Sequence, residues 1–183
     1  AQFADGLVNG VSYTTTSGLS GITGDQGADG SFQYNDGDTI TFSVGAVVIA
    51  VFPSSVIQGN ILFLQDIAEV ALSNTNSNYV ENMSIFLQAI SEGLEDSDGS
   101  DGVLNTNDII NMPASGSVIT ITQEMRDAFA DYSLTLSEAG KQMLSEALAH
   151  VGIVFTRETE LSDGSGQNVF ESDAIEHVTD TIT

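Results

Sequence analysis

The sequence has no cysteine and no tryptophan, and Lys and Arg together supply only 3 of its 183 residues. Without Cys the chain forms no disulfide, no thiolate nucleophile and no cysteine-ligated zinc or iron–sulfur site. So few cations exclude binding to nucleic acid through its phosphates or to an anionic membrane surface, since both need clusters of Lys and Arg. The longest apolar run, residues 44–52, is far shorter than the roughly 20 residues of a membrane-spanning helix, so we expect no membrane insertion.

Acidic residues dominate what is present. Asp and Glu number 26, which gives a formal net charge of −23 at pH 7, while 41% of the residues are hydrophobic. That apolar fraction is enough for a folded core and argues against disorder of the whole chain. The acidity has two interpretations that the sequence does not separate: solvation in a saline habitat, or binding of cations between subunits.

The composition also bears on localisation. The first residue is Ala1 rather than Met, and Asn, Ser, Thr, Gly and Asp are abundant. A small residue at this place is typical of a chain whose signal peptide has been removed. We therefore expect a secreted, extracellular protein of the cell surface or matrix.

The hydrophobic pattern changes near Pro53. Before it, apolar residues alternate with polar ones over 11–16, 32–34 and 40–44, and residues 47–52 form a continuous apolar strand. Turn sequences rich in Gly and Asp separate these segments. Short strands joined by tight turns predict a small antiparallel β-sandwich.

After Pro53 the apolar period becomes about 3.6 residues, which predicts helices. One apolar stripe begins at Ile61 and ends at Leu72, and a second begins at Met83 and ends at Leu94. Thr122 is the predicted cap of a third helix, and Thr135 with Glu138 forms the predicted capping box of a fourth.

The pattern as a whole predicts a single α+β domain over 1–183, in which a small antiparallel β-sandwich carries a helical insertion or lobe. Two further strands, at 118–121 and 153–155, flank the last two long helices. The expected parts are a mainly β segment at 1–52, a mainly helical segment at 53–151 with an acidic loop at 95–108, and a returning strand with a short helix at 152–183.

The acidic loop has the composition of a calcium site, because calcium takes six to eight oxygen ligands from carboxylates, amides and backbone carbonyls. With Asp101 at position five of an EF-hand-like loop, a glycine falls at six, the Val103 carbonyl at seven, Asn105 at nine and Asp108 at twelve. Asp96 and Asp98 match positions one and three if one residue is inserted before Asp101. The alternative is a solvated acidic turn. The predicted calcium ligands are Asp96, Asp98, Asp101, Val103, Asn105 and Asp108.

A second group of carboxylates lies in the turns of the β segment. Asp25, Asp29, Asp36 and Asp38 would hold a second cation if the hairpin tips met at one end of a sandwich. The alternative is ordinary turn chemistry, since Asp-Gly and Asn-Asp-Gly are common turn sequences.

Signals for an enzyme are weak. His150 falls at the end of a predicted helix, where an imidazolium interacts favourably with the helix dipole, and His177 falls in the last helix. Neither lies near a nucleophile motif, and the chain has no nucleophile elbow, metalloprotease helix or phosphate-binding loop. We therefore expect a protein without catalytic residues.

Several segments carry a resemblance to a known class. Gly10–Thr15, Ala28–Phe32 and Gly37–Gly45 resemble the opening of bacterial exported lipoproteins and adhesin-like surface proteins. The β part of those proteins is similar to the carboxypeptidase-regulatory sandwich, of the transthyretin-like or Cna-B-like kind. Asn82–Ile90 with the acidic loop behind it, and Ala174–His177, resemble their helix and closing helix. The lipobox Cys is missing and the acidic loop is longer than in those proteins. The resemblance implies an exported, non-catalytic surface or matrix role.

The leading hypothesis is a non-catalytic structural or adhesive extracellular protein, stabilised by calcium, that self-associates into a homopolymer. A filament built by strand donation is one form of this. The C-terminal segment 179–183 and an N-terminal run are the candidate donors, and the alternative is that both ends pair within their own chain. The N-terminal donor residues are Phe3, Leu7, Val8, Val11 and Tyr13.

Two other functions stay open. A monomeric binding module, displayed on a surface for a glycan or a protein ligand, predicts a monomer at high concentration. A secreted hydrolase with paired carboxylates predicts one acid-to-amide change that abolishes turnover.

Overall fold

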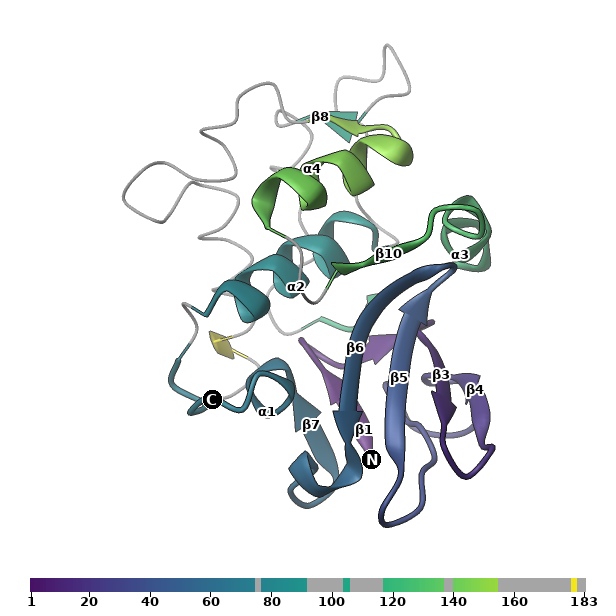
Figure 1. Ribbon diagram of the computed structural model, residues 1–183, viewed down its shortest axis with the longest axis vertical. Coiled ribbons are helices and arrows are strands. Elements are labelled where there is room, and N and C mark those ends of the chain that lie inside the picture. Colours follow the sequence, from purple (N-terminus) through teal and green to yellow (C-terminus); the bar gives the residue numbers. More distant parts are fainter. Residues whose placement is uncertain (75–76, 92–103, 106–116, 137–139, 155–178, 181–183) are drawn as a thin grey trace.

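The computed structural model describes residues 1–74, 77–91, 104–105, 117–136, 140–154 and 179–180. In this part of the chain the fold is mixed α/β, with helices α2 and α4 stacked on one another beside the main sheet (Figure 1). The strands are β1 Gln2–Ala4, β2 Val8–Asn9, β3 Ser12–Thr15, β4 Ser20–Ile22, β5 Thr39–Val44, β6 Val47–Pro53, β7 Ile61–Phe63, β8 Leu104–Asn105, β9 Ile119–Thr120, β10 Leu134–Thr135 and β11 Ile153–Val154. The helices are α1 Leu64–Ile67, α2 Asn78–Ala89, α3 Gln123–Ala128 and α4 Lys141–His150, with a 3₁₀ turn at Ser54–Val56.

The main sheet has five strands in the order β10-β6-β5-β3-β4. Four of them are antiparallel neighbours, and β10 adds in parallel to β6. Alternation along β5 buries Ile40, Phe42 and Val44 on the inner face, as the sequence pattern predicts.

The tight turn between β5 and β6 contains Gly45 at a φ of 57°, where a Cβ would lie 2.5 Å from the Arg126 carbonyl oxygen of α3. A glycine is needed there because α3 packs directly against this turn.

A bulge in the main sheet decides which residues of β6 face outward. Phe42 pairs with Ala50 whereas Ser43 pairs with Val48, so Ile49 is the extra residue. Ile49 and Ala50 are consequently both buried. The Tyr79 hydroxyl of α2 donates to the Ile49 carbonyl at 3.0 Å, which ties the helix to the bulge. Burial raises the pKa of Tyr79 above its ordinary value, so this phenol keeps the proton that it donates.

The predicted antiparallel sandwich is not confirmed. The remaining strands form three separate parallel pairs, β1 with β7, β2 with β9 and β11 with β8. Phe32 and Tyr34, which were expected in a strand, lie outside the strands and join the aromatic core instead, with the Phe32 and Phe42 rings 5.1 Å apart. Alternation marks a segment as extended with one buried face, but it does not specify the partner strand.

Two of the predicted helices are confirmed. The second apolar stripe forms α2, which Ser77 caps by accepting a hydrogen bond from the Val80 N–H at 3.2 Å. Thr122 caps α3 as predicted, accepting from the Met125 N–H at 3.2 Å. The helix α2 ends at Ala89, and Leu94 lies outside the described residues.

The other two helix predictions are wrong in their boundaries. The segment that begins at Ile61 starts as strand β7, and the helix α1 lasts only from Leu64 to Ile67. The Asp66 carboxylate accepts from the Phe63 N–H at 2.9 Å, which starts the helix there, while β1 supplies the ladder partner for β7. Thr135 pairs with Val48 in β10 and does not cap a helix.

Gly140 stands at the N-cap of α4, which begins at Lys141, and Glu138 lies outside the described residues. Apolar spacing alone did not detect that the chain adds the strand β10 to β6 before α4 begins. Strands of the expected kind are present at 119–120 and 153–154, but they lie in two different sheets.

The core joins both halves of the chain. A single cluster of buried apolar residues extends from Phe3 to Ile153 and includes the inner face of the main sheet and most of α2. The parallel pairs connect the N-terminal strands to segments far along the chain, because β1 pairs at 61–63 and β2 pairs at 119–120.

The N-terminal candidate donor strand is therefore used within its own chain. Phe3, Val8 and Val11 are 0% exposed, and Tyr13 is 4% exposed. Leu7 is partly buried and adopts a left-handed φ of 52°. The sequence left two alternatives for this end, donation to another copy or pairing within the chain. In the structure the N-terminal strands pair within their own chain. In the C-terminal candidate, Thr179 and Asp180 are helical and 181–183 lie outside the described residues.

No helix among the described residues is both long and apolar enough to cross a bilayer.

Candidate functional site

The predicted calcium loop lies almost entirely outside the described residues. Asp96, Asp98, Asp101, Val103 and Asp108 are not described. Asn105 is described by its backbone, in β8, which pairs in parallel with β11.

The second predicted set contains one buried carboxylate, that of Asp38, which is 4% exposed. Its Oδ2 accepts from the Asn35 N–H at 2.8 Å and from the Ser17 hydroxyl at 2.8 Å. Its Oδ1 accepts from the Ser17 N–H at 2.9 Å and the Thr16 hydroxyl at 3.1 Å. The hydrogen bond from the Asn35 backbone lowers the pKa of Asp38 most, and those from Ser17 and Thr16 add to it and outweigh burial. This carboxylate joins the β3–β4 turn to the entry of β5.

Replacing Asp38 with asparagine is expected to lower the melting temperature by several degrees at neutral pH, because the amide cannot accept all four hydrogen bonds. A carboxyl whose pKa is lowered by folding contributes stability above its ordinary value of 3.8, and this contribution is lost as the pH falls through the lower folded-state pKa. The difference between wild type and Asp38→Asn should therefore be full at pH 7 and shrink in acid. Thermal melts of both proteins across this pH range test it.

The matched control for that experiment is Asp36→Asn. Asp36 is exposed in the same turn, and its replacement by asparagine removes the same charge. An equal loss of melting temperature in both variants would mean that net charge, rather than the Asp38 network, sets the effect.

Asp29 has a different local role at another turn. Its Oδ1 accepts from the Asn9 side-chain amide at 2.8 Å, and the Gly30 N–H donates to the Asn9 Oδ1 at 2.7 Å. The Asp29 backbone carbonyl also accepts from the Gln2 side-chain amide at 2.8 Å. These contacts fasten the turn to β1 and β2, whereas Asp25 is exposed.

The four aspartates are thus not brought together as one cation site. Within the described part of the chain, no three His, Cys, Asp or Glu side chains come close enough together to hold a metal ion. Asp29 and Asp38 each stabilise a separate turn, which is the alternative that the turn sequences allowed.

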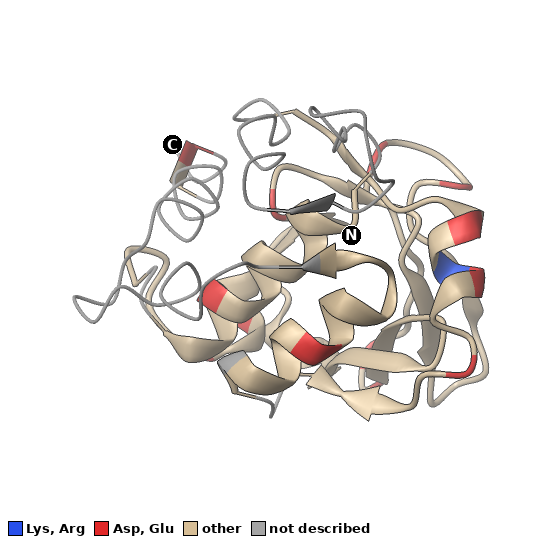
Figure 2. Cartoon of the chain, turned by 90° about the horizontal axis from the view of Figure 1, so that it is seen from above, with Lys and Arg blue, Asp and Glu red and all other residues tan. Residues whose placement is uncertain are grey.

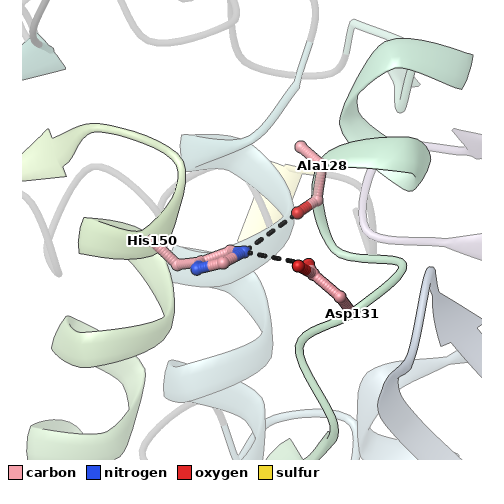
Figure 3. A network of polar contacts seen from close by, with 3 residues as sticks. All are labelled: Ala128, Asp131 and His150. Atoms are coloured by element: carbon pink, nitrogen blue, oxygen red, sulfur yellow. Dashed lines mark hydrogen bonds and ion pairs between the residues drawn. The ribbon is translucent and has the colours of Figure 1, made fainter.

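His150 is the last residue of α4, as the sequence pattern predicts, and it joins α4 to the end of α3 (Figure 3). Its Nε2 lies 3.0 Å from the Ala128 carbonyl oxygen and 3.6 Å from the Asp131 Oδ1. Since a carbonyl only accepts, this nitrogen carries the proton that is donated. The imidazole also lies against Tyr132, with ring centroids 4.5 Å apart. These contacts give His150 a structural position between two helix ends, and His177 lies outside the described residues.

Asp5 is a buried carboxylate that the sequence analysis did not identify. It follows β1, is 1% exposed, and accepts a hydrogen bond from the Gln88 side-chain amide of α2 at 3.4 Å. The residues of α2 from Val80 to Ala89 are all buried, including its polar ones. A helix buried on all sides needs internal partners for its polar groups, and the apolar stripe gave no information about them.

The outer face of the main sheet carries no charged side chain. Indeed none of the described strands contains Asp, Glu, Lys or Arg, and in Figure 2 the strands are tan while the acidic residues lie on helices and loops. Strand register places Thr14, Thr41 and Val51 in one outward row, and Ser12, Ser43 and Val48 in the next. We call this surface the hydroxyl face. Its residues are Ser12, Thr14, Ser20, Ile22, Thr39, Thr41, Ser43, Val48, Val51, Pro53 and Thr135.

The hydroxyl face is in contact with solvent. Val51 is 56% exposed, Thr14 and Thr39 are exposed, and Thr41 and Ser43 are half-buried between neighbouring strands. Thr and Val are good strand formers, and Asp, Glu and Lys are depleted in strands, so strand propensity contributes to this composition. In a chain of net charge −23, the result is a solvent-exposed sheet face without carboxylates.

A shallow hollow of about 420 Å³ lies where α3 meets one end of this face. The Gln123, Arg126 and Asp127 side chains in it are hydrogen-bonded to one another and to the backbone. Arg126 donates to the Gly10 and Ile121 carbonyls, both at 2.8 Å, and to Gln123 Oε1 at 2.9 Å, while Gln123 donates to Asp127 at 2.7 Å. The hollow is lined by Ser12, Ile22, Gly45, Ala46, Gln123, Arg126, Asp127 and Ala130.

Comparison with known proteins gives no assignment: no protein-family model, no curated protein and no solved structure matches the chain. The resemblance to exported adhesin-like proteins with a Cna-B-like sandwich therefore stays a prediction, and the function is inferred from the residues themselves.

Proposed function

We propose that the chain is a non-catalytic extracellular structural or adhesive protein that associates with copies of itself and is stabilised by calcium. The observation that carries this proposal is the uncharged, solvent-exposed hydroxyl face on a chain of net charge −23. Charge away from zero normally keeps identical proteins apart, so a surface without carboxylates is where they can meet. Donation of the N-terminal strand is not part of this proposal, because β1 pairs with β7 of its own chain.

Self-association is tested by sedimentation velocity of the purified protein over a range of concentrations, in millimolar calcium and then in excess chelator. We expect the sedimentation coefficient to rise with concentration, and to a greater extent in calcium, because divalent cations reduce repulsion between acidic copies. A single monomeric species at every concentration, with and without calcium, would contradict the proposal. That result would favour a surface-displayed binding module, for which the hollow beside α3 is the candidate ligand position.

Calcium stabilisation is tested separately, through the acidic loop. Calcium that binds only the folded protein should raise the free energy of unfolding, by about 2.7 kcal/mol at a hundred-fold excess over the Kd. The double variant Asp101→Asn/Asp108→Asn removes two of the predicted ligands and should lose most of this gain. Thermal melts in calcium and in chelator give the comparison.

The control for the calcium experiment is Asp25→Asn/Asp36→Asn. It removes the same two charges at exposed turn positions outside the loop. If both double variants lose the calcium effect equally, calcium acts by general screening and the loop is not its site.

A further inference from the structure

We propose that the hydroxyl face packs against the same face of a second copy, sheet to sheet, to give a two-fold symmetric dimer. This inference rests on the proposed self-association and names the surface that makes it. Three properties of the face favour a second copy as its occupant: the chemistry of its polar groups, its charge and its shape.

Hydroxyl groups suit an interface between identical surfaces. A Ser or Thr hydroxyl both donates and accepts, whereas a carboxylate accepts only. In a two-fold interface each patch meets its own copy, so it must supply donors and acceptors together. The outward hydroxyls of Thr14, Thr41 and Ser43 meet this condition. A face of carboxylates would present acceptors to acceptors.

Charge favours the same contact. Two carboxylates brought to 4 Å repel by about 1 kcal/mol in water, and by more near a protein surface. Two copies of this chain, each at −23, meet such repulsion wherever their acidic helices and loops approach. The strands of the hydroxyl face bring no carboxylate into the contact, because they contain none. Asp127 of α3 borders the face at one end, beside Ser12 and Ile22, where it lies with Arg126.

The shape of the face is that of one layer of a sheet pair. Twisted sheets pack face to face with strands about 30° apart, and side chains of the two layers interdigitate. Val51, at 56% exposed, and the outward Val48 and Ile22 supply apolar surface that such packing would bury.

The area of the hydroxyl face sets the expected strength of association between two copies. Each outward residue of a sheet covers about 33 Å² from the strand spacing and rise, so the face offers about 350 Å² per copy. The total of about 700 Å² is below the roughly 1,200 Å² of a stable complex. We therefore expect a weak dimer in rapid exchange, which forms at high local concentration.

The test places one carboxylate on the face. Thr41→Glu and Val51→Glu each bring like charges together across the two-fold axis, so we expect self-association measured by sedimentation to weaken by at least about ten-fold. Val51→Glu changes an exposed side chain, so it gives the same test if Thr41→Glu lowers the melting temperature. The control is Gln142→Glu, which adds the same charge at an exposed position on α4.

The outcomes separate this inference from the proposed function. Weakened association of both face variants, with Gln142→Glu unchanged, supports the dimer through the hydroxyl face. Association of wild type and both face variants to the same extent overturns the inference and leaves self-association standing, on another surface. A wild type that stays monomeric throughout overturns both.

Discussion

Replacement of Phe42 by alanine is expected to lower the free energy of unfolding by about 3 to 5 kcal/mol. Phe42 is 0% exposed on β5, and its ring centroid lies 4.9 Å from that of Phe3, 5.1 Å from that of Phe32 and 5.2 Å from that of Phe52. Removing the ring takes away the contact that joins β1, β5, β6 and the 32–34 segment, and it leaves a cavity that a packed core cannot fill by collapse. Urea denaturation followed by far-ultraviolet circular dichroism measures the loss.

The matched control is Val51→Ala, on the adjacent strand but with an outward and 56% exposed side chain. Its expected effect is about 1 kcal/mol or less, since the change affects strand propensity and little buried surface. If the two variants lost equal stability, the assignment of the inner and outer faces of the sheet would be wrong, and with it the residues of the hydroxyl face.

The second large effect is expected for Gly10→Ala, between β2 and β3. Gly10 has a φ of +89°, and a Cβ there would lie 1.9 Å from the Ile121 carbonyl oxygen and 3.0 Å from Arg126 Nη1. The methyl group would separate the backbone carbonyls that Arg126 holds together, at Gly10 and Ile121. We expect the left-handed conformation to cost about 1 to 2 kcal/mol and the overlap a further 1 to 3 kcal/mol, again measured by urea denaturation.

Gly18→Ala measures the cost of the left-handed conformation without the steric overlap. Gly18 has a φ of +93°, and a Cβ there would meet nothing within 4 Å. The variant should lose only the conformational part, about 1 to 2 kcal/mol. Equal losses in Gly10→Ala and Gly18→Ala would show that the close approach of Gly10 to the β9–α3 junction does not contribute.

The helices illustrate where sequence reasoning succeeds. The apolar stripe that starts at Met83 and the cap at Thr122 are local signals, because a helix satisfies its backbone within itself and its cap is a neighbouring side chain. Both predictions are confirmed. The helix predictions for the segment after Ile61 and for the residues near Thr135 failed. Each of these segments adds a short strand to a partner far along the chain, at β1 and β6. No local periodicity reports such a partner.

The carboxylates show the same division. Asp29 and Asp38 were correctly placed in turns by their sequence neighbours, but their partners Asn9 and Ser17 come from other turns and strands. Whether four aspartates meet at one point depends on where the turns lie in the fold, which no single turn sequence determines. The calcium loop, whose ligands lie close together in sequence, stays a prediction from spacing.

By itself, the sequence determined that the chain is acidic, free of disulfides, apolar enough to fold, extended in several segments before Pro53, and helical in α2 and α3 after it. These are properties of composition and local spacing. Only the tertiary structure decided the parallel pairs that connect the two halves and the residues that face outward on the main sheet. Val48 and Val51 are an odd number of positions apart, so strict alternation places them on opposite faces, yet the bulge at Ile49 turns both outward. A bulge forms only when two strands pair, which is why the uncharged face could not be derived from one segment alone.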